Sequence, residues 1–364
     1  MKNYELHQYR PAPICDMHIH PHVEAPLEDS LKVFQNIIDH FNYERIALES
    51  LPSHDIINNF KVLYFKSRLP NAYANLGLIH HYNETDTQQT YLQQAQAFYR
   101  MGCDGFKMLE GKPKNRKQLN RPLDDTLFDR FYDFAEKNEL PIVLHFGDPR
   151  EFWDVNRIPK WALDRGWLYD ETYVPFEAAQ KEVEGILKKF PKLKLILAHF
   201  FFVSDDIDYA EKFMSQWPNI CFDLTPGSEM YDNFNQNITE WKKFFTKHSD
   251  RILYGTDIYN WHQENLSIEE RYAHAVNLVR SFLEKKEAFW DHWRGKPMQH
   301  PFGFNDDILE KIYRQNFLRV FGKTPRELDP EFIVHQCQLF LSSYSLTDSE
   351  TNHMNQIINW FQMS

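Results

Sequence analysis

Eight short runs of apolar and β-branched residues recur at nearly regular intervals, and this spacing constrains the fold more than any other feature of the chain. The runs are ICDMHI (14–19), RIALES (45–50), YANLGLI (73–79), DGFKML (104–109), PIVLHF (141–146), KLILAH (194–199), ICFDL (220–224) and RILYGT (251–256). Their first residues lie 31, 28, 31, 37, 53, 26 and 31 positions apart. A strand and the helix that leads back to the next parallel strand need about 30 residues. The spacing therefore predicts eight βα units.

A closed barrel accounts for eight such units better than an open sheet does. A doubly wound open sheet commonly carries a Gly-rich phosphate loop after its first strand, whereas here His18, Ile19 and His20 end that strand. We therefore expect an α/β protein with the (β/α)8 TIM-barrel fold. Apolar residues at three- and four-residue steps predict helices between the strands, and the clearest examples are 31–41, 90–101 and 127–140.

Two intervals are long enough to hold extra structure. We expect long loops after the fifth strand (148–175) and after the eighth strand (259–305), and in a barrel both would lie at the active-site mouth. The barrel domain is predicted over residues 1–323 and ends with a helix over 306–322. The remaining residues, 324–364, are predicted to form a helical C-terminal extension.

Charge and composition exclude several classes of protein. The chain has 41 Lys and Arg against 52 Asp and Glu, so its net charge is 41 − 52 = −11, which leaves no excess of positive charge for a nucleic acid. No stretch approaches the roughly 20 apolar residues of a membrane span. Residues 1–15 contain no apolar run of the kind found in secretory signals, so we expect no such signal. Cys15, Cys103, Cys221 and Cys337 are far apart, which predicts reduced thiols and a cytoplasmic protein. The expected partners are a small-molecule substrate and further copies of this chain.

The first strand ends in a pair of candidate metal ligands. Side chains of a strand alternate between its faces, so His18 and His20 should both point toward the barrel axis while Met17 and Ile19 face the helices. Two imidazoles on one face make a ready pair of ligands for a divalent ion. By itself, such a pair is more often a polar pair at a barrel mouth.

Three further polar residues strengthen the metal hypothesis. His145, His199 and Asp257 each end an otherwise apolar strand or directly follow one. Polar residues at the carboxyl ends of barrel strands are typical of catalysis rather than of stability. Four imidazoles and one carboxylate at the same end of strands 1, 5, 6 and 8 therefore indicate a metal site.

In this order of ligands the sequence resembles the amidohydrolase superfamily, and within it the amidohydrolase-2 branch, to which aminocarboxymuconate-semialdehyde decarboxylase and related metal-dependent hydrolases belong. The stretches that carry the resemblance span roughly residues 13–322 and are CDMHIH, GFKMLEG, LPIVLHFGDP, FPKLKLILAHF, RILYGTD and IYRQNFLRVFG. The resemblance implies that one divalent metal, usually zinc, is held by His18, His20, His145 and Asp257. It also implies that His199 lies beside the water or the substrate. Manganese would suit the same ligands.

The number of metals depends on Lys107 in the fourth strand. Binuclear amidohydrolases bridge two metals with a carboxylated lysine in that strand, so a two-metal site stays open. The sequence GFK also occurs in single-metal members of the branch, where the lysine is structural or contacts the substrate. We therefore expect an unmodified Lys107 and one metal. Polymerase-and-histidinol-phosphatase barrels fit less well, because Tyr259 stands where they have a histidine.

The predicted reaction is metal-dependent hydrolysis of an amide, ester or lactone bond in a small carboxylated molecule. Asp257 would accept a proton from a metal-activated water, and His199 would stabilise the oxyanion or protonate the leaving group. The alternative is a metal-dependent decarboxylase, a lyase acting on a small unsaturated or aromatic acid. Lys107, Arg150 and Trp153 are the candidate substrate-binding residues, although a loop salt bridge with Glu151 or Asp154 is the more common role for an arginine placed like Arg150.

Overall fold

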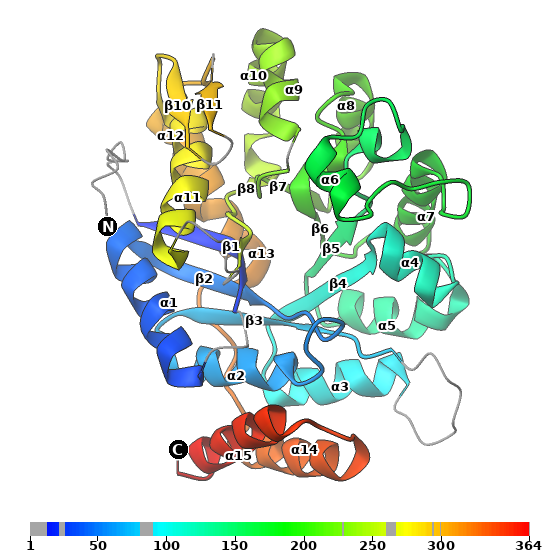
Figure 1. Ribbon diagram of the computed structural model, residues 1–364, viewed down its shortest axis with the longest axis vertical. Coiled ribbons are helices and arrows are strands. Elements are labelled where there is room, and N and C mark those ends of the chain that lie inside the picture. Colours follow the sequence, from blue (N-terminus) through cyan, green and yellow to red (C-terminus); the bar gives the residue numbers. More distant parts are fainter. Residues whose placement is uncertain are drawn as a thin grey trace.

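The computed structural model describes residues 13–21, 26–80, 90–227, 229–259, 267–292, 295–298 and 300–363. Parallel strands follow one another in chain order around a nearly closed barrel, with helices between them (Figure 1). The strands are β1 (Ile14–His20), β2 (Tyr43–Glu49), β3 (Ala72–Gly77), β4 (Gly105–Gly111), β5 (Ile142–Phe146), β6 (Leu195–Leu197), β7 (Ile220–Asp223), β8 (Ile252–Leu253) and β9 (Ile258–Tyr259). The predicted (β/α)8 barrel is confirmed.

The eighth position of the barrel is shared by β8 and β9. The first of these pairs with β7, and the second pairs with β1 through Ile19 and Ile258. Between them, the backbone N–H of Met17 donates to the carbonyl of Tyr254 at 3.1 Å. One stretch of chain therefore joins the last strand to the first and closes the sheet.

Helices lie outside the strands (Figure 1). Those of the barrel are α1 (Leu27–Phe41), α2 (Asn58–Arg68), α3 (Tyr91–Met101), α4 (Pro113–Leu119), α5 (Thr126–Lys137), α7 (Phe176–Lys189), α8 (Ile207–Gln216), α9 (Met230–Gln236), α10 (Ile238–Lys247), α11 (Ile268–Glu284), α12 (Asp306–Glu310) and α13 (Asn316–Phe321). Short helical turns are η1 (Arg150–Trp153), η2 (Ala198–Phe202), η3 (Ser249–Arg251) and the π-helical η4 (Lys311–Gln315).

The ends of α3 illustrate how the sequence sets these helices. The Oγ1 of Thr90 accepts from the backbone N–H of Gln93 at 3.2 Å, and the Gln93 side chain accepts from the backbone N–H of Thr90 at 2.9 Å. This reciprocal pair satisfies two donors that the first helical turn leaves open. The helix stops at Gly102, whose φ of 97° a side chain would oppose.

The barrel interior is filled by side chains from successive strands. An inner cluster joins Met17 of β1 to residues of β2, β5, β6 and β8, and its further members include Ala47, Val143, Ile196 and Leu253. Phe317 and Phe321 of α13 belong to the same cluster, so α13 packs against the interior from one end. The opposite end, where the parallel strands finish, is left for polar side chains.

The expectation that Met17 faces the helices is wrong. It lies in the inner cluster with Cys15, whereas Ile14 and Ile19 lie in the outer core. The cause is a register shift between Asp16 and Ile19, where β1 gains one residue relative to β2. Such a bulge shifts the alternation of faces by one residue. Cys15 and Met17 therefore point inward before the bulge, and His18 and His20 point inward after it.

Both expected long loops carry structure of their own. The loop after β5 contains η1 and α6 (Lys160–Asp164), and aromatic side chains form its small core. The segment after β9 contains α11 and the antiparallel pair β10 (Phe289–Asp291) and β11 (Lys296–Met298). Trp261, which belongs to the same segment, lies outside the described residues.

The C-terminal extension is helical, as predicted, and packs on the outside of the barrel. It consists of α14 (Pro330–Ser343) and α15 (Asp348–Met363), which lie beside α2 and α3 (Figure 1). The indole N–H of Trp360 donates to the Oγ of Ser67 at 2.8 Å, and the rings of Phe60 and Phe340 meet edge to face. The division into residues 1–323 and 324–364 stays a prediction.

All four cysteines fall in the described ranges, where they are buried free thiols. Among the described helices, none is both long enough and apolar enough to cross a bilayer.

Candidate metal centre

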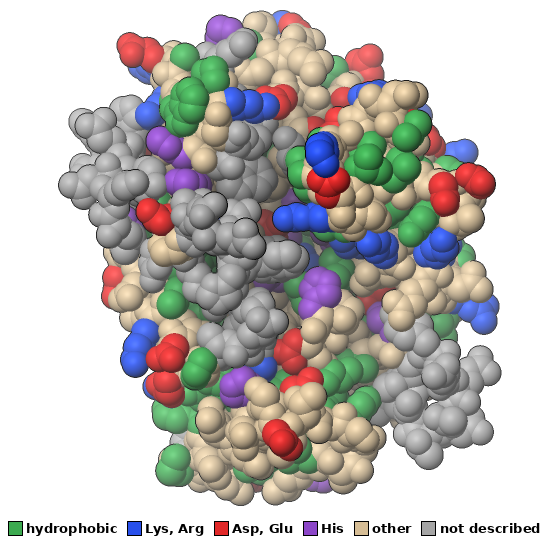
Figure 2. Space-filling model, in the orientation of Figure 1, with side chains coloured by type: hydrophobic (Ala, Val, Ile, Leu, Met, Phe, Trp, Pro, Cys, Tyr) green, Lys and Arg blue, Asp and Glu red, His purple; other side chains and the backbone are tan. Residues whose placement is uncertain are grey.

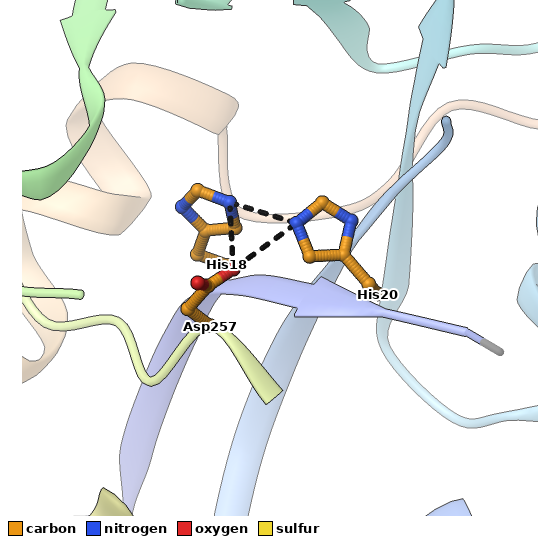
Figure 3. A group of neighbouring side chains, drawn as sticks. All are labelled: His18, His20 and Asp257. Atoms are coloured by element: carbon orange, nitrogen blue, oxygen red, sulfur yellow. Dashed lines mark hydrogen bonds and ion pairs between the residues drawn. The ribbon is translucent and has the colours of Figure 1, made fainter. Parts of the chain in front are cut away.

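Three of the predicted ligands converge at the ends of the strands that close the barrel. His18 and His20 come from β1, and Asp257 lies just before β9 (Figure 3). The two Nε2 atoms are 3.1 Å apart, and the Oδ1 of Asp257 lies 3.2 Å from the Nε2 of His20 and 3.6 Å from that of His18. Ligands around a tetrahedral zinc ion lie roughly 3.3 Å from one another. The spacing of these atoms therefore fits a metal ion.

Hydrogen bonds on the far sides of the rings set the state of both histidines. The Nδ1 of His18 donates to the Oδ2 of Asp223 at 2.8 Å, and the Nδ1 of His20 donates to the backbone carbonyl of Glu49 at 3.0 Å. A neutral imidazole with its proton on Nδ1 presents a lone pair at Nε2. Burial lowers the pKa of both histidines, which keeps the rings neutral.

Asp257 supplies the third electron-rich atom. Its Oδ1 is buried and receives no hydrogen bond from the part of the chain that the structure describes. Leaving a buried charged oxygen unsatisfied costs free energy. The lone pairs on the two Nε2 atoms and the unsatisfied oxygen of Asp257 face one point, as the ligands of a cation do. His18, His20 and Asp257 could therefore hold a metal ion.

His145 lies beside this group rather than within it. The group of atoms within 4.8 Å of one another contains only His18, His20 and Asp257 among the described residues. The ring of His145 meets the ring of His199, with 4.8 Å between their centroids, while its Nε2 lies 3.1 Å from the carbonyl of Gly147. Burial lowers the pKa of His145 to about 3. Its assignment as a fourth ligand stays a prediction.

His199 approaches the group from the neighbouring side of the barrel. Its ring centroid is 5.9 Å from that of His18. It opens a run of left-handed residues in which His199, Phe200, Phe201 and Phe202 have φ between 51° and 57°. Such φ values are strained for residues with side chains and are typical of functional sites. The rings of the three phenylalanines are buried, which helps to hold the turn.

Lys107 of β4 reaches the candidate metal site. Its Nζ donates to the Nε2 of His18 at 2.8 Å, so in this structure it contacts a nitrogen that a metal would bind. Burial lowers the pKa of its amine, and Glu49 opposes that shift more than any other neighbouring charge. The lysine is therefore placed to influence metal binding, while its unmodified state stays a prediction.

The two other candidate substrate residues are engaged elsewhere. The guanidinium of Arg150 donates to Glu177 at 2.8 Å and lies 3.4 Å from Asp205, rather than pairing with Glu151 or Asp154. The indole N–H of Trp153 donates to the carbonyl of Val174, and its ring packs in the small core of the β5 loop. Substrate binding by Arg150 or Trp153 stays a prediction. The contacts that occupy both side chains do not favour it.

Cationic side chains nevertheless lie close to the site. In Figure 2, Lys and Arg side chains gather over α4 and the loop that carries α6, beside the hollow in the middle of this face. Lys112, just before α4, donates to Asp148 at 3.0 Å, and Asp148 lies 3.7 Å from the Nε2 of His145. Tyr169 donates to the other oxygen of Asp148.

Our reading of the sequence missed Asp223 and Thr225. Asp223 ends β7 and is fully buried, and it accepts hydrogen bonds from the ring of His18 and the backbone of His199. The signal was present, because a polar residue at the end of the apolar run ICFD follows the same pattern that identified His145 and Asp257.

A TIM barrel with imidazole and carboxylate ligands at its strand ends defines a class of metal-dependent enzymes. A family model described as Amidohydrolase (Amidohydro_2) matches residues 81–323, which is 243 of the 364 residues. The chain belongs to this amidohydrolase family, as the sequence resemblance predicted. His18 and His20 precede the matched range, so their role rests on the geometry.

Solved structures resemble the chain over most of its length. An uncharacterized TIM-barrel protein from Bordetella bronchiseptica is 14% identical (TM-score 0.52, covering 85% of this chain and 98% of that one). A probable 2-pyrone-4,6-dicarboxylic acid hydrolase from Acinetobacter baumannii, with citric acid bound, is 14% identical (TM-score 0.51, 85% and 99%). The IDCase of Metarhizium anisopliae in apo form is 13% identical (TM-score 0.51, 86% and 98%). At such identities the likeness shows the fold. No curated protein sequence matches the chain.

Proposed function

We propose that the protein is a metal-dependent hydrolase that cleaves an amide, ester or lactone bond in a small carboxylated molecule. One observation carries the proposal: the carboxylate of Asp257 has an unsatisfied buried oxygen beside two imidazole lone pairs, yet its side chain is 20% exposed. A group that both faces a cation site and remains accessible can meet a substrate. The imidazoles of His18 and His20 are almost completely enclosed.

The proposed cofactor is one divalent ion, zinc in preference to manganese, with His18, His20 and Asp257 as ligands and His145 as the fourth. Membership of a family that is generally metal-dependent supports this assignment. Nitrogen donors of histidine and oxygen donors of aspartate are ligands that zinc takes in catalytic sites. When bound, such an ion polarises a carbonyl oxygen and lowers the pKa of water.

The side chains divide the proton transfers between them. Asp257 accepts the proton of the attacking water, since it is the carboxylate of the group and its side chain is partly accessible. The Nδ1 of His199 donates to the carbonyl of Thr225 at 3.3 Å, which leaves a lone pair on its Nε2. That atom can take up the proton that Asp257 removes from the water and pass it to the leaving group. Lys107 must turn away from His18 when an ion occupies the site, and its ammonium group can then bind a substrate carboxylate.

The carboxylated substrate follows from the charge around the site. The Lys and Arg side chains that gather over α4 and the loop carrying α6 lie beside the hollow in Figure 2 and would attract an anion. The net charge of −11 supports the absence of a nucleic-acid partner. A cytoplasmic location and a homo-oligomeric state complete the proposal.

The runner-up is a decarboxylase of a small unsaturated or aromatic acid, and a carboxylate clamp at Arg150 would favour it. That guanidinium already pairs with Glu177 and Asp205, so hydrolysis is preferred.

A substrate panel tests the proposal. Zinc-loaded protein is incubated with small carboxylated lactones, esters and amides, and separately with unsaturated and aromatic acids, while acid release and CO₂ release are both measured. We expect acid release from the first group, abolished by a chelator and by Asp257→Asn. Release of CO₂ without bond hydrolysis would favour the decarboxylase instead. Stable zinc binding without either reaction would contradict both.

A further inference from the structure

A single buried carboxylate connects the two histidines on which the proposed chemistry depends. Asp223 is fully buried at the end of β7, between the strands that lead to His18 and His199. Its Oδ2 accepts from the Nδ1 of His18 at 2.8 Å. Its Oδ1 accepts from the backbone N–H of His199 at 2.8 Å and from both the hydroxyl and the backbone N–H of Thr225.

The bond to His18 controls a candidate metal ligand. Because a carboxylate can only accept, it requires the proton of the neutral ring to be on Nδ1. The lone pair is then on Nε2, the atom that faces His20 and Asp257. A carboxylate behind a metal-binding imidazole fixes the ring orientation and raises its basicity.

The bonds to His199 control a strained backbone. His199 has a φ of 54° and begins four consecutive left-handed residues. Its N–H is held by Asp223 and, at 3.2 Å, by the hydroxyl of Thr225, whose backbone carbonyl also receives the ring Nδ1. Conformations of this kind persist only where the surroundings enforce them.

We propose that Asp223 is a positioning residue with two separable tasks. Through its Oδ2 it fixes the metal-binding state of His18, and through its Oδ1, together with Thr225, it fixes the place of His199. Thr225 serves only the second task, because within the described residues its hydrogen bonds go to His199 and Asp223 and not to His18. The inference rests on the proposed metal-dependent hydrolase and adds two residues to its machinery.

Two isosteric substitutions separate the tasks. In Asp223→Asn the amide oxygen can keep the bonds to His199 and Thr225, so the amide N–H₂ faces the Nδ1 of His18. A donor at that place favours the ring form with its proton on Nε2. In that form Nε2 has no lone pair to offer to a metal. Thr225→Val replaces the hydroxyl with a methyl group and leaves the bond between Asp223 and His18 in place.

The experiment makes three measurements on the full chain. Chelator competition gives the zinc affinity, and the visible spectrum of the cobalt-substituted protein reports the metal environment. The third measurement is kcat for the ester or lactone that the wild type hydrolyses. Asp223→Asn should bind zinc roughly 10- to 100-fold more weakly and change the cobalt spectrum. Thr225→Val should bind zinc within about twofold of the wild type but lose at least roughly tenfold in kcat. Thr225→Ser, which keeps the hydroxyl, should restore kcat.

The outcomes distinguish this inference from the proposed function. If the wild type binds no divalent ion, the proposed function fails and the inference fails with it. If the wild type binds zinc and Asp223→Asn binds it equally well, only the inference is overturned. It is also overturned if Thr225→Val weakens zinc binding as much as Asp223→Asn does. Should Asp223→Asn not fold, the Thr225→Val and Thr225→Ser pair still decides the His199 task.

Discussion

At the scale of single residues, His199 is held differently from the histidines of β1. Its backbone and its Nδ1 are bound by Asp223 and Thr225 on the neighbouring strand, so its position does not depend on a metal. The rings of His18 and His20 instead direct their Nε2 atoms toward Asp257. The two kinds of histidine should therefore respond differently to substitution.

We predict that His199→Asn keeps most of the metal and loses roughly 10²- to 10⁴-fold in rate, the usual cost of removing a general acid or base. His20→Asn should lose metal and activity together, because its Nε2 is a proposed ligand. Metal content by elemental analysis and kcat, measured on both variants, check this. Equal loss of metal in the two variants would indicate that His199 is itself a ligand and would contradict the prediction.

Lys107 gives a prediction about the number of metals. Its amine donates to the Nε2 of His18 and so competes with an ion for that nitrogen. Lys107→Met should bind one zinc at least as tightly as the wild type, while activity falls roughly 10- to 100-fold through the loss of the charged hydrogen bond that we propose Lys107 makes to the substrate. A bridging, carboxylated lysine predicts the reverse, because the variant would then lose its metals. Isothermal titration with zinc decides between them.

At the scale of elements, the sequence was sufficient to locate all eight strand positions. The observed strands begin within two residues of the predicted runs, because buried parallel strands are short apolar segments bounded by helical ones. The bulge in β1 could not be predicted, since it depends on pairing with β2. The left-handed turn at His199 was equally hidden, because its sequence, HFFF, contains no glycine.

The end of α10 is tied to α8 through Glu211, which accepts from Lys247, Ser215 and, at 2.9 Å, His248. Burial raises the pKa of Glu211, but these hydrogen bonds lower it further, to about 2. A carboxyl whose folded pKa is depressed stabilises the fold above its unfolded pKa of about 4.3 and loses that contribution as pH falls toward 2.

Glu211→Gln should therefore lower the free energy of unfolding at pH 7 by less than about 1 kcal/mol, because the site is partly exposed, and by less still at pH 3. Denaturant unfolding at the two pH values measures this. Glu240→Gln, which alters an exposed pair with Lys243, is the control and should show little effect at either pH. A larger loss at pH 3 than at pH 7 would contradict the assignment.

At the scale of the whole molecule, Asp104 joins the barrel to the C-terminal extension. It accepts from the Nζ of Lys66 at 2.6 Å and from the backbone N–H groups of Ala74 and Arg326, each at 2.7 Å. Lys66 is almost fully buried, so its charge depends on this partner. The extension is thus connected by a buried network as well as by apolar packing.

We predict that Asp104→Ala lowers the free energy of unfolding by roughly 3–5 kcal/mol, because it leaves Lys66 buried without its counter-charge. Asp129→Ala, which removes a partly exposed pair with Lys189, should cost less than about 1 kcal/mol. Denaturant midpoints compare the two. Equal midpoints would mean that Lys66 is well solvated without Asp104.

The candidate site as a whole was only partly predictable. Strand-end positions identified His18, His20, His199 and Asp257, because the ends of parallel strands meet at one face of a barrel. The partner of Trp153 lies in the β5 loop, and those of Arg150 lie in α7 and in the turn before α8, so no local pattern could reveal them.

The most direct test of the central claim is the anomalous scattering of zinc in crystals of the full chain. The account predicts one peak within about 2.0–2.3 Å of the Nε2 atoms of His18 and His20 and of the Oδ1 of Asp257. It also predicts that Lys107 has moved off His18. The absence of a peak there, or two peaks joined by a carboxylated Lys107, would contradict it.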